Sequence, residues 1–536
     1  MKRTLISAAC LLLCGAALAQ NLDPTVEVTN AYVREASGIE KPSQLLEVPD
    51  SVLRFNLDFV YAVNETPYQG AYEFTPYLVQ TRPQSRPSQE GTLYLRAGAG
   101  YTLHPELAVV YTPVKTQKLH VNLFADHHSF IGDYHTIALD SQNCFTPDGT
   151  TWKGKNMRSS VGADALLNWG KTQAALELRY QHILATHQTK GDLSNNKFQL
   201  KGRLSTPASA RVSLNLSTRL SYLGVNEARE FHNVTDAVLG YRMEDGRLAL
   251  NLGFQALANS GNFLTAFSAA PHYQYGRGRL NVDLGVKLSF LSRSANDFYP
   301  SPSGIIFPDV RLSYAAVPDK LVFTASATGG DKLWVYTEII DSNPYLPFAP
   351  VYMDNTAERV NLALGARGQL SSRFHYSVQG GFAYKTHALL PGYRGNTSYF
   401  GFVDALTQFF AQAACGWKSD VLDVDAGLAW RNTRVSAANA EDTLFLPAAL
   451  SGNTSVFYKW GTRLKAGVRM NAQSKRLAPA STLPGFVDLG LSADFGITRS
   501  LGVWMRAGNL LNQVVQTNAF YAEKGVYFTA GISWNL

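Results

Sequence analysis

The segment GVYFTAGISWNL, from Gly525 to Leu536, decides the fold class of this chain. Successive side chains of a β-strand point to opposite faces, so alternating apolar and polar residues predict a strand with two unlike faces. One row of this segment is apolar throughout: Val526, Phe528, Ala530, Ile532, Trp534 and Leu536. The other row is polar or small: Tyr527, Thr529, Gly531, Ser533 and Asn535. The segment therefore predicts a strand between an apolar and a polar environment.

The same alternation recurs from Gly91 onward. It is clearest in these runs: Arg211 to Tyr222, Arg247 to Leu257, Arg279 to Phe290, Arg373 to Lys385 and Phe486 to Ile497. The polar rows carry charges of both signs, which is typical of a water-filled lumen, whereas the apolar rows suit lipid. These runs predict an all-β fold, a transmembrane antiparallel β-barrel of about 22 strands (an even number, roughly 18–22) preceded by a small N-terminal segment.

Turn chemistry separates the predicted strands into hairpins. Short polar links recur at Gly170-Lys171-Thr172, Glu244-Asp245-Gly246, Gly276-Arg277-Gly278, Pro318-Asp319, Ser371-Ser372, Ser419-Asp420 and Thr498-Arg499-Ser500. Longer segments, expected to be loops, lie between them: Ser129 to Asn156, Arg293 to Ser303, Gly329 to Glu358, His387 to Ser398, Val435 to Leu446, Ala472 to Leu483 and Gln513 to Glu523. Bacterial barrels alternate short periplasmic turns with long extracellular loops, so this pattern supports the barrel.

The N-terminus has the pattern of an export signal. Lys2 and Arg3 precede a short apolar run, and Ala17-Leu18-Ala19 resembles a cleavage site, so residues 1–19 are expected to be a signal peptide. Residues 20–90 are rich in proline and are predicted to be a periplasmic or reduced-plug segment, before a barrel at 91–536. Cys144 and Cys415 are expected to be unpaired thiols. Removing Lys2 and Arg3 lowers the net charge from +7 to +5, too little to indicate a nucleic-acid partner.

The end of the chain resembles the TonB-dependent receptors. Asn509-Leu510-Leu511-Asn512, then Tyr521, Gly525 and the final strand, is similar to the ending of that family. The resemblance covers residues 91–536 and implies an outer-membrane barrel that takes up a ligand, although the segment before it is shorter than the family's plug. Asp23, Thr25, Val26 and Val28 are similar to the box that such receptors present to TonB, where an extended segment adds to a partner sheet. An ordinary strand or linker is the alternative.

Three sets of residues are candidates for function. The outward row of the last strand is the predicted signal for the barrel-assembly machinery: Val526, Phe528, Ile532, Trp534 and Leu536. Charges predicted on the lumen rows form a polar pathway with a weak preference for anions, a docking surface for a plug, or a salt-bridge lining that only solvates the lumen. They are Lys197, Lys201, Arg203, Arg211, Arg219, Arg247, Arg279, Asp283 and Lys287. Aromatic residues of one long loop either grip a ligand or fold as a lid over the pore: Trp334, Tyr336, Tyr345, Phe348 and Tyr352.

Other chemistry has weak support in the sequence. Asp126-His127-His128, with His120 and His135 nearby, lacks a fixed metal-ligand spacing, so no metal site and no cofactor are predicted. No catalytic motif stands out, and no enzyme activity is expected.

The sequence thus predicts an outer-membrane receptor-type barrel for uptake or passage of an unidentified ligand. Its expected partners are outer-membrane lipid, the barrel-assembly machinery and either TonB or a surface lipoprotein. The alternative is a non-transporting barrel that serves as a structural or assembly partner in the cell envelope.

Overall fold

The computed structural model describes residues 92–101, 103–207, 209–225, 228–259, 262–293, 305–346, 354–436, 442–461 and 463–536. The chain divides into two units, Met1–Pro42 with Tyr77–Arg86 and Ser43–Pro76 with Pro87–Leu536, and the described residues belong to the second. The predicted signal peptide, the 20–90 segment and the TonB-box candidate (Asp23, Thr25, Val26 and Val28) lie outside the described residues.

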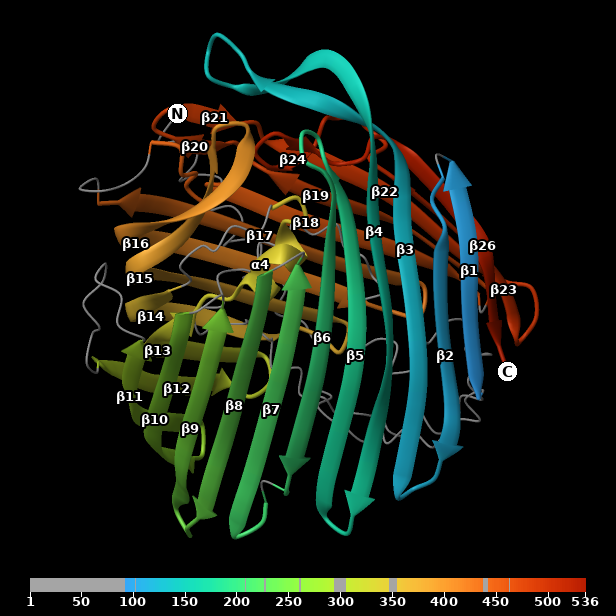
Figure 1. The fold of residues 1–536 in the computed structure, drawn as a ribbon. Coiled ribbons are helices and arrows are strands. Elements are labelled where there is room, and N and C mark those ends of the chain that lie inside the picture. The colour runs from blue at the N-terminus through green and yellow to red at the C-terminus, as the bar shows by residue number, and fades with distance from the viewer. Residues whose placement is uncertain are drawn as a thin grey trace, which may run out of the picture. The chain divides into compact units, whose positions relative to one another are not determined.

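Long antiparallel strands make up almost all of the described chain (Figure 1). The first are β1 (Leu93–Tyr101), β2 (Glu106–Lys115), β3 (Leu119–Leu139), β4 (Phe145–Trp169), β5 (Thr172–His187), β6 (Gly191–Ser205), β7 (Val212–Val225), β8 (Ala228–Arg242), β9 (Gly246–Asn259), β10 (Asn262–Arg277) and β11 (Leu280–Arg293). There follow β12 (Ile305–Val317), β13 (Leu321–Leu333), β14 (Asn355–Gln369), β15 (Phe374–Arg394), β16 (Thr397–Lys418), β17 (Leu422–Val435), β18 (Leu450–Trp460), β19 (Leu464–Gln473), β22 (Phe486–Gly496), β23 (Leu501–Gly508) and β26 (Tyr527–Asn535).

These strands form one closed antiparallel barrel of 22 strands. Each pairs with the next along the chain, and β26 pairs with β1 through a register that includes Gly98 opposite Gly531. The links hold four short strands, β20 (Arg476–Ala478), β21 (Ser481–Leu483), β24 (Gln516–Asn518) and β25 (Tyr521–Ala522), and the helix α4 (Tyr336–Ser342). The predicted fold class and strand number are therefore confirmed. Closure removes the sheet edges, which cannot lie unpaired in lipid.

The two rows of each strand face different surroundings. Large apolar side chains point outward all around the barrel, for example Leu178 on β5, Leu284 on β11 and Leu364 on β14, each at least 40% exposed. The opposite rows are polar, as with Asn122 on β3 and Ser221 on β7. An apolar exterior and a polar interior are what a barrel needs in order to cross a membrane. Among the described helical residues there is no stretch long and apolar enough to span a bilayer.

The predicted tight turns are present at one end of the barrel, as at Gly170, Pro318 and Ser371. At the opposite end two predicted loops are wrong. Most of Ser129 to Asn156 is a ladder between β3 and β4, interrupted by one register shift after His135, and most of His387 to Ser398 is a ladder between β15 and β16. Figure 1 shows the β3–β4 hairpin rising beyond its neighbours. Both hairpins have apolar residues buried against other parts of the chain, at consecutive positions in Ala388, Leu389 and Leu390, so they lack the alternation by which a spanning strand is recognised.

Candidate functional site in the barrel lumen

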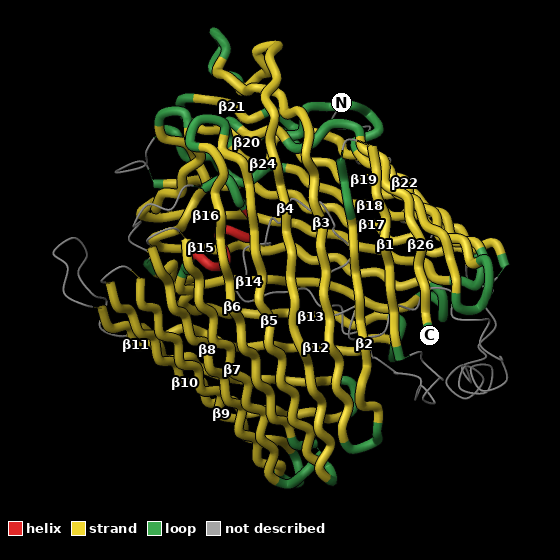
Figure 2. Tube along the Cα trace, turned by 45° about the vertical axis from the view of Figure 1, so that its right-hand side comes forward, coloured by secondary structure: helices red, strands yellow, loops and turns green. Residues whose placement is uncertain are grey.

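The link between β13 and β14 supplies the helix α4 inside the barrel (Figures 1 and 2). Residues 334–346, here called the lumen segment, contain α4 and the turn after it. The segment has few of the features by which an isolated helix begins. Val335 precedes the helix and provides no side-chain cap, so the first N–H groups of α4 need partners from elsewhere.

Glu230 on β8 provides those partners. The N–H of Tyr336 donates to one carboxylate oxygen of Glu230 at 2.8 Å, and the N–H of Thr337 donates to the other at 2.7 Å. The Thr337 hydroxyl donates to this second oxygen at 2.5 Å, while the Asn259 amide donates to the first at 3.3 Å. A carboxylate at a helix N-terminus satisfies its free donors and complements its dipole. The barrel wall therefore caps the helix.

Cations of the wall hold the other side of α4. The Lys197 ammonium on β6 lies 2.5 Å from an Asp341 carboxylate oxygen and donates to the Thr337 carbonyl at 3.1 Å. The Arg219 guanidinium on β7 lies 3.1 Å from Glu338, and that of Arg158 on β4 donates to the Asp341 carbonyl at 3.1 Å. Because Lys197 is only 4% exposed, its charge relies on these contacts rather than on water.

Apolar packing completes the attachment of the lumen segment. Tyr336, Ile339 and Ile340 belong to one buried cluster with wall residues from widely separated strands: Ile183 on β5, Leu223 and Val225 on β7, Leu257 on β9, Leu264 on β10 and Leu389 on β15. Tyr345 belongs to a second cluster and stacks on Tyr521 of β25 with ring centroids 4.5 Å apart. The segment therefore joins distant parts of the wall across the lumen.

This arrangement locates the aromatic residues predicted in the long loop. Tyr336 and Tyr345 are buried, and Trp334 packs against the first cluster and donates its indole N–H to Thr356 at 2.8 Å. Burial raises the pKa of the Tyr336 and Tyr345 hydroxyls, so both remain neutral. The described aromatic residues thus belong to the folded lumen segment, and both readings of the loop, a ligand grip and a lid over the pore, stay predictions. Phe348 and Tyr352 lie outside the described residues.

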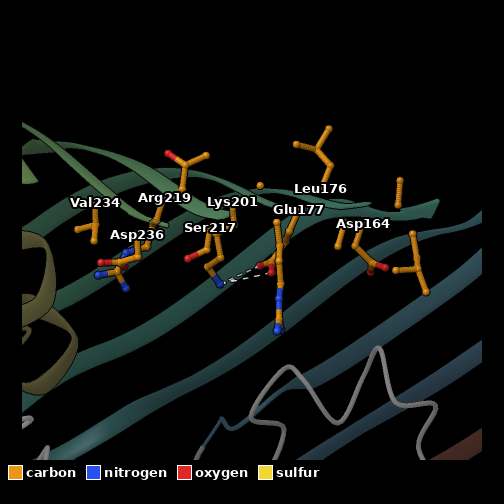
Figure 3. A pocket seen from close by; sticks show the side chains of 14 residues that line it. Asp164, Leu176, Glu177, Lys201, Ser217, Arg219, Val234 and Asp236 are labelled. Carbon is orange, nitrogen blue, oxygen red and sulfur yellow. Dashed lines mark hydrogen bonds and ion pairs between the residues drawn. The ribbon is translucent and has the colours of Figure 1, made fainter. Parts of the chain in front are cut away.

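A cavity of about 450 Å³ adjoins the lumen segment along β4 to β8 (Figure 3). Its charged lining residues are Asp164, Glu177, Lys201, Arg203, Arg219 and Asp236. Arg219 also pairs with Glu338 of α4, so the cavity and the lumen segment share a residue. The Lys201 ammonium lies 3.2 Å from Glu177. Polar groups that converge in a lumen cavity are a candidate ligand-contact site.

The strand register explains why these charges meet. Asp164 lies opposite Glu177, Glu177 opposite Lys201, and Lys201 opposite Arg219. Like charges on directly opposite residues are unfavourable, and the Glu177–Lys201 pair relieves part of that repulsion. The cavity lining has as many carboxylates as cations. The expected weak preference for anions is therefore not supported here, because neighbouring strands contribute acidic residues that a count along one strand leaves out.

The remaining predicted lumen charges lie in different places. Arg247 donates to the lumen-facing Ser213 at 2.8 Å, Asp283 lies 2.8 Å from His272, and Lys287 lies on the same face of β11 as Asp283. Arg211 and Arg279 lie in the links β6–β7 and β10–β11, not on the lumen rows. Arg211 donates to the exposed Tyr241 hydroxyl at 3.0 Å, and Arg279 donates to the Ala316 carbonyl at 3.0 Å. Both arginines lie just before a strand begins, where the periodicity no longer fixes the direction of a side chain.

The terminal strand presents its candidate residues outward. Val526, Phe528, Ile532, Trp534 and Leu536 are between 41% and 51% exposed, whereas Thr529 and Ser533 on the other row are buried. Their role in assembly stays a prediction.

The histidine group near Asp126 separates into two faces. His127 contacts Ser159 and Ser129, and Asp126 accepts from Ser160 on the lumen face. The rise along a strand puts His120 roughly 27 Å from His128. The histidines near Asp126 therefore do not form one metal site together.

Sequence reasoning missed Glu230, the residue that caps the lumen segment, and the acidic residues Asp164, Glu177 and Asp236 of the cavity. Glu230 follows a loop in an ordinary alternating run, and nothing local distinguishes it. The acidic residues occupy lumen rows, so alternation together with charge was a signal that could have found them.

Comparisons with known proteins place this fold. No family model matches the sequence, and no curated protein matches it. Among solved structures, the FrpB iron transporter from Neisseria meningitidis aligns with a TM-score of 0.65 at 9% identity, covering 84% of this chain and 83% of that one. The copper transporter OprC aligns with a TM-score of 0.60 at 13% identity, covering 84% of each chain.

The siderophore receptor PiuA from Acinetobacter baumannii aligns with a TM-score of 0.60 at 8% identity, covering 84% of this chain and 82% of that one. At such identities the likeness concerns the fold alone. The predicted resemblance is confirmed at that level: this chain has the barrel fold of the TonB-dependent receptors of the outer membrane.

Proposed function

We propose that this protein is an outer-membrane transporter of the receptor type, in which a ligand passes through the lumen and the lumen segment acts as its gate. The observation that carries this proposal is the attachment of α4 to the wall by Glu230, Lys197 and Arg219 beside a polar cavity. A barrel that only stabilised the envelope would need neither a charged cavity nor a segment folded across its lumen.

The lumen segment is attached by an apolar cluster and by polar contacts to Glu230, Lys197 and Arg219, and the polar contacts are the ones that a polar ligand can displace. Ion pairs and hydrogen bonds exchange with water or with a polar ligand more readily than an apolar core opens. Arg219 contacts both Glu338 and the cavity, so a ligand that draws Arg219 into the cavity weakens one attachment of α4. Differential binding of this kind is the physical requirement for ligand-driven opening.

The fold supports transport as the general role. The solved structures with the same fold are described as iron and copper transporters and as a siderophore receptor. We propose uptake of a polar, charged ligand for this chain, with no enzyme activity. We also propose that TonB binds residues 23–28 and supplies the energy for this uptake.

Conductance in planar bilayers tests the gate. Full-length protein should show small currents in potassium chloride, and deleting residues 336–346 should enlarge them. The matched control is Glu177→Gln, which alters the cavity without touching α4. Equal currents for the full-length protein and the deletion would contradict the gate and favour the alternative of a structural or assembly partner in the envelope. Heat-modifiable migration in gels confirms that each variant is a folded barrel.

A further inference from the structure

We propose that His104, Glu106 and His128 form a binding site for a divalent transition-metal ion of the zinc class, on the lumen face of the wall where β1, β2 and β3 meet. The three side chains offer one ligand atom each, and these atoms all lie within 4.8 Å of one another. The site is separate from the lumen segment and from the cavity, and it does not depend on the proposed transport function.

The fold brings these residues together from two hairpins. Glu106 begins β2 and lies directly opposite His128 in the β2–β3 register, so both side chains point to the same face. His104 lies in the short link between β1 and β2, two positions before Glu106. The site therefore requires both the short link and the correct pairing of β2 with β3.

The distances match those that a metal ion requires. Glu106 Oε1 lies 3.4 Å from His104 Nε2 and 3.4 Å from His128 Nδ1. Ligands bound at about 2.0–2.1 Å around a tetrahedral ion lie roughly 3.3–3.4 Å apart, so these two pairs are already spaced for binding. Only the two imidazoles have to approach each other. Two imidazole nitrogens and one carboxylate oxygen are a ligand set that zinc accepts, with a fourth position left for water.

The surroundings orient the ligands. Arg506 lies 3.8 Å from Glu106 Oε2, on the opposite oxygen from the imidazoles, and thereby leaves Oε1 directed at the site. The His104 ring stacks on Tyr527 with centroids 5.1 Å apart and is fully buried. Contacts of this kind fix the ligands before the ion arrives and raise the affinity for it.

Lys524 competes with the ion for His104. Its Nζ lies 3.3 Å from His104 Nε2 and 3.5 Å from the centroid of the Tyr527 ring, and the residue is 5% exposed. The hydrogen bond from Lys524 uses the same lone pair that the metal requires. Binding of the ion therefore replaces this contact and links the β1–β2 hairpin to β3, while Lys524 moves aside.

Metal titration of full-length protein in detergent, without a histidine tag and after treatment with a chelator, tests the site. Isothermal titration with Zn²⁺ should give one strong site, which His104→Gln and His128→Gln weaken by at least about a hundredfold. His135→Gln is the matched control, because His135 is an exposed histidine on the same strand. Co²⁺ in place of Zn²⁺ should show the visible absorption of a tetrahedral ion, lost in the same two variants.

Lys524→Met separates this proposal from a loss of folding. Removing the competing hydrogen bond should tighten Zn²⁺ binding by roughly tenfold, a gain that a misfolded barrel cannot produce. Zinc affinity that is unchanged in His104→Gln and His128→Gln, or the absence of a strong site in the wild-type protein, would overturn the site. Weaker binding by Lys524→Met in a folded barrel would overturn the competition.

Discussion

Replacing Glu230 by alanine should release the N-terminus of α4 from the barrel wall. The carboxylate accepts hydrogen bonds from the N–H of Tyr336 and from the N–H and hydroxyl of Thr337, and the side chain is fully buried. Alanine leaves these donors without an acceptor and leaves a void at the helix start. The contacts through Lys197 and Arg219 remain, so the segment is loosened rather than lost.

The magnitude follows from the contacts. Leaving buried neutral donors without their acceptor costs about 1–3 kcal/mol. Since about 1.4 kcal/mol is a factor of ten, the ratio of open to closed lumen segment should rise by roughly 5- to 150-fold. Even after this rise, the open lumen segment is a minority of molecules if the closed state is stable. The assay must therefore detect brief exposure of residues that are buried in the closed state.

A single buried thiol measures that exposure. Ile340 is fully buried on α4, so Ile340→Cys, with Cys10, Cys14, Cys144 and Cys415 all replaced by serine, reports opening through its rate of reaction with a maleimide. When closing is faster than labelling, the rate is proportional to the open population. Adding Glu230→Ala should raise this rate by about 5- to 150-fold, whereas the control Glu177→Ala should leave it unchanged. Equal rates with and without Glu230 would refute the assignment of Glu230 as the main attachment.

Three further predictions concern closure, assembly and partners. A Cβ at Gly531 would lie 2.0 Å from the Ala97 carbonyl oxygen, so Gly531→Val should prevent β26 from closing against β1, whereas Gly525→Val, with no atom nearer than 3.9 Å to its Cβ, should be tolerated. Heat-modifiable migration distinguishes them. The double change Phe528→Asp and Trp534→Asp puts two charges on the outward face. A basic side chain there costs ~2–4 kcal/mol near the bilayer midplane and an acidic one costs less. The double variant should fail to assemble, whereas Thr529→Ser, on the buried row, should assemble normally. Assembly is measured by surface protease accessibility, and equal assembly of the double variant and of Thr529→Ser would refute the assignment of the two faces. Deleting residues 23–28 should abolish capture of the protein by a purified TonB C-terminal domain; undiminished capture would show that this segment is not the box.

The sequence alone determined the architecture, because a barrel repeats one local rule. Every spanning strand must place apolar side chains toward lipid and polar side chains toward the lumen, so period-two alternation appears in each strand by itself. The outward row of Val526, Phe528, Ile532 and Trp534 was predicted from this rule, and its exposure follows it. Where the rule lapses, as in the β3–β4 and β15–β16 hairpins beyond the membrane, the prediction of loops was wrong.

Only the tertiary structure decided what fills the lumen. The cap of α4 comes from Glu230, more than one hundred positions earlier in the chain, and contacts between such distant residues leave no local pattern. The cavity depends on the register that sets Asp164, Glu177, Lys201 and Arg219 in one row across four strands. Likewise, His128 was considered with its sequence neighbours, but β-strand geometry turns His127 to the other face and the barrel places His128 beside His104 and Glu106. Local periodicity fixes which face a side chain takes, whereas pairing and closure fix its partners.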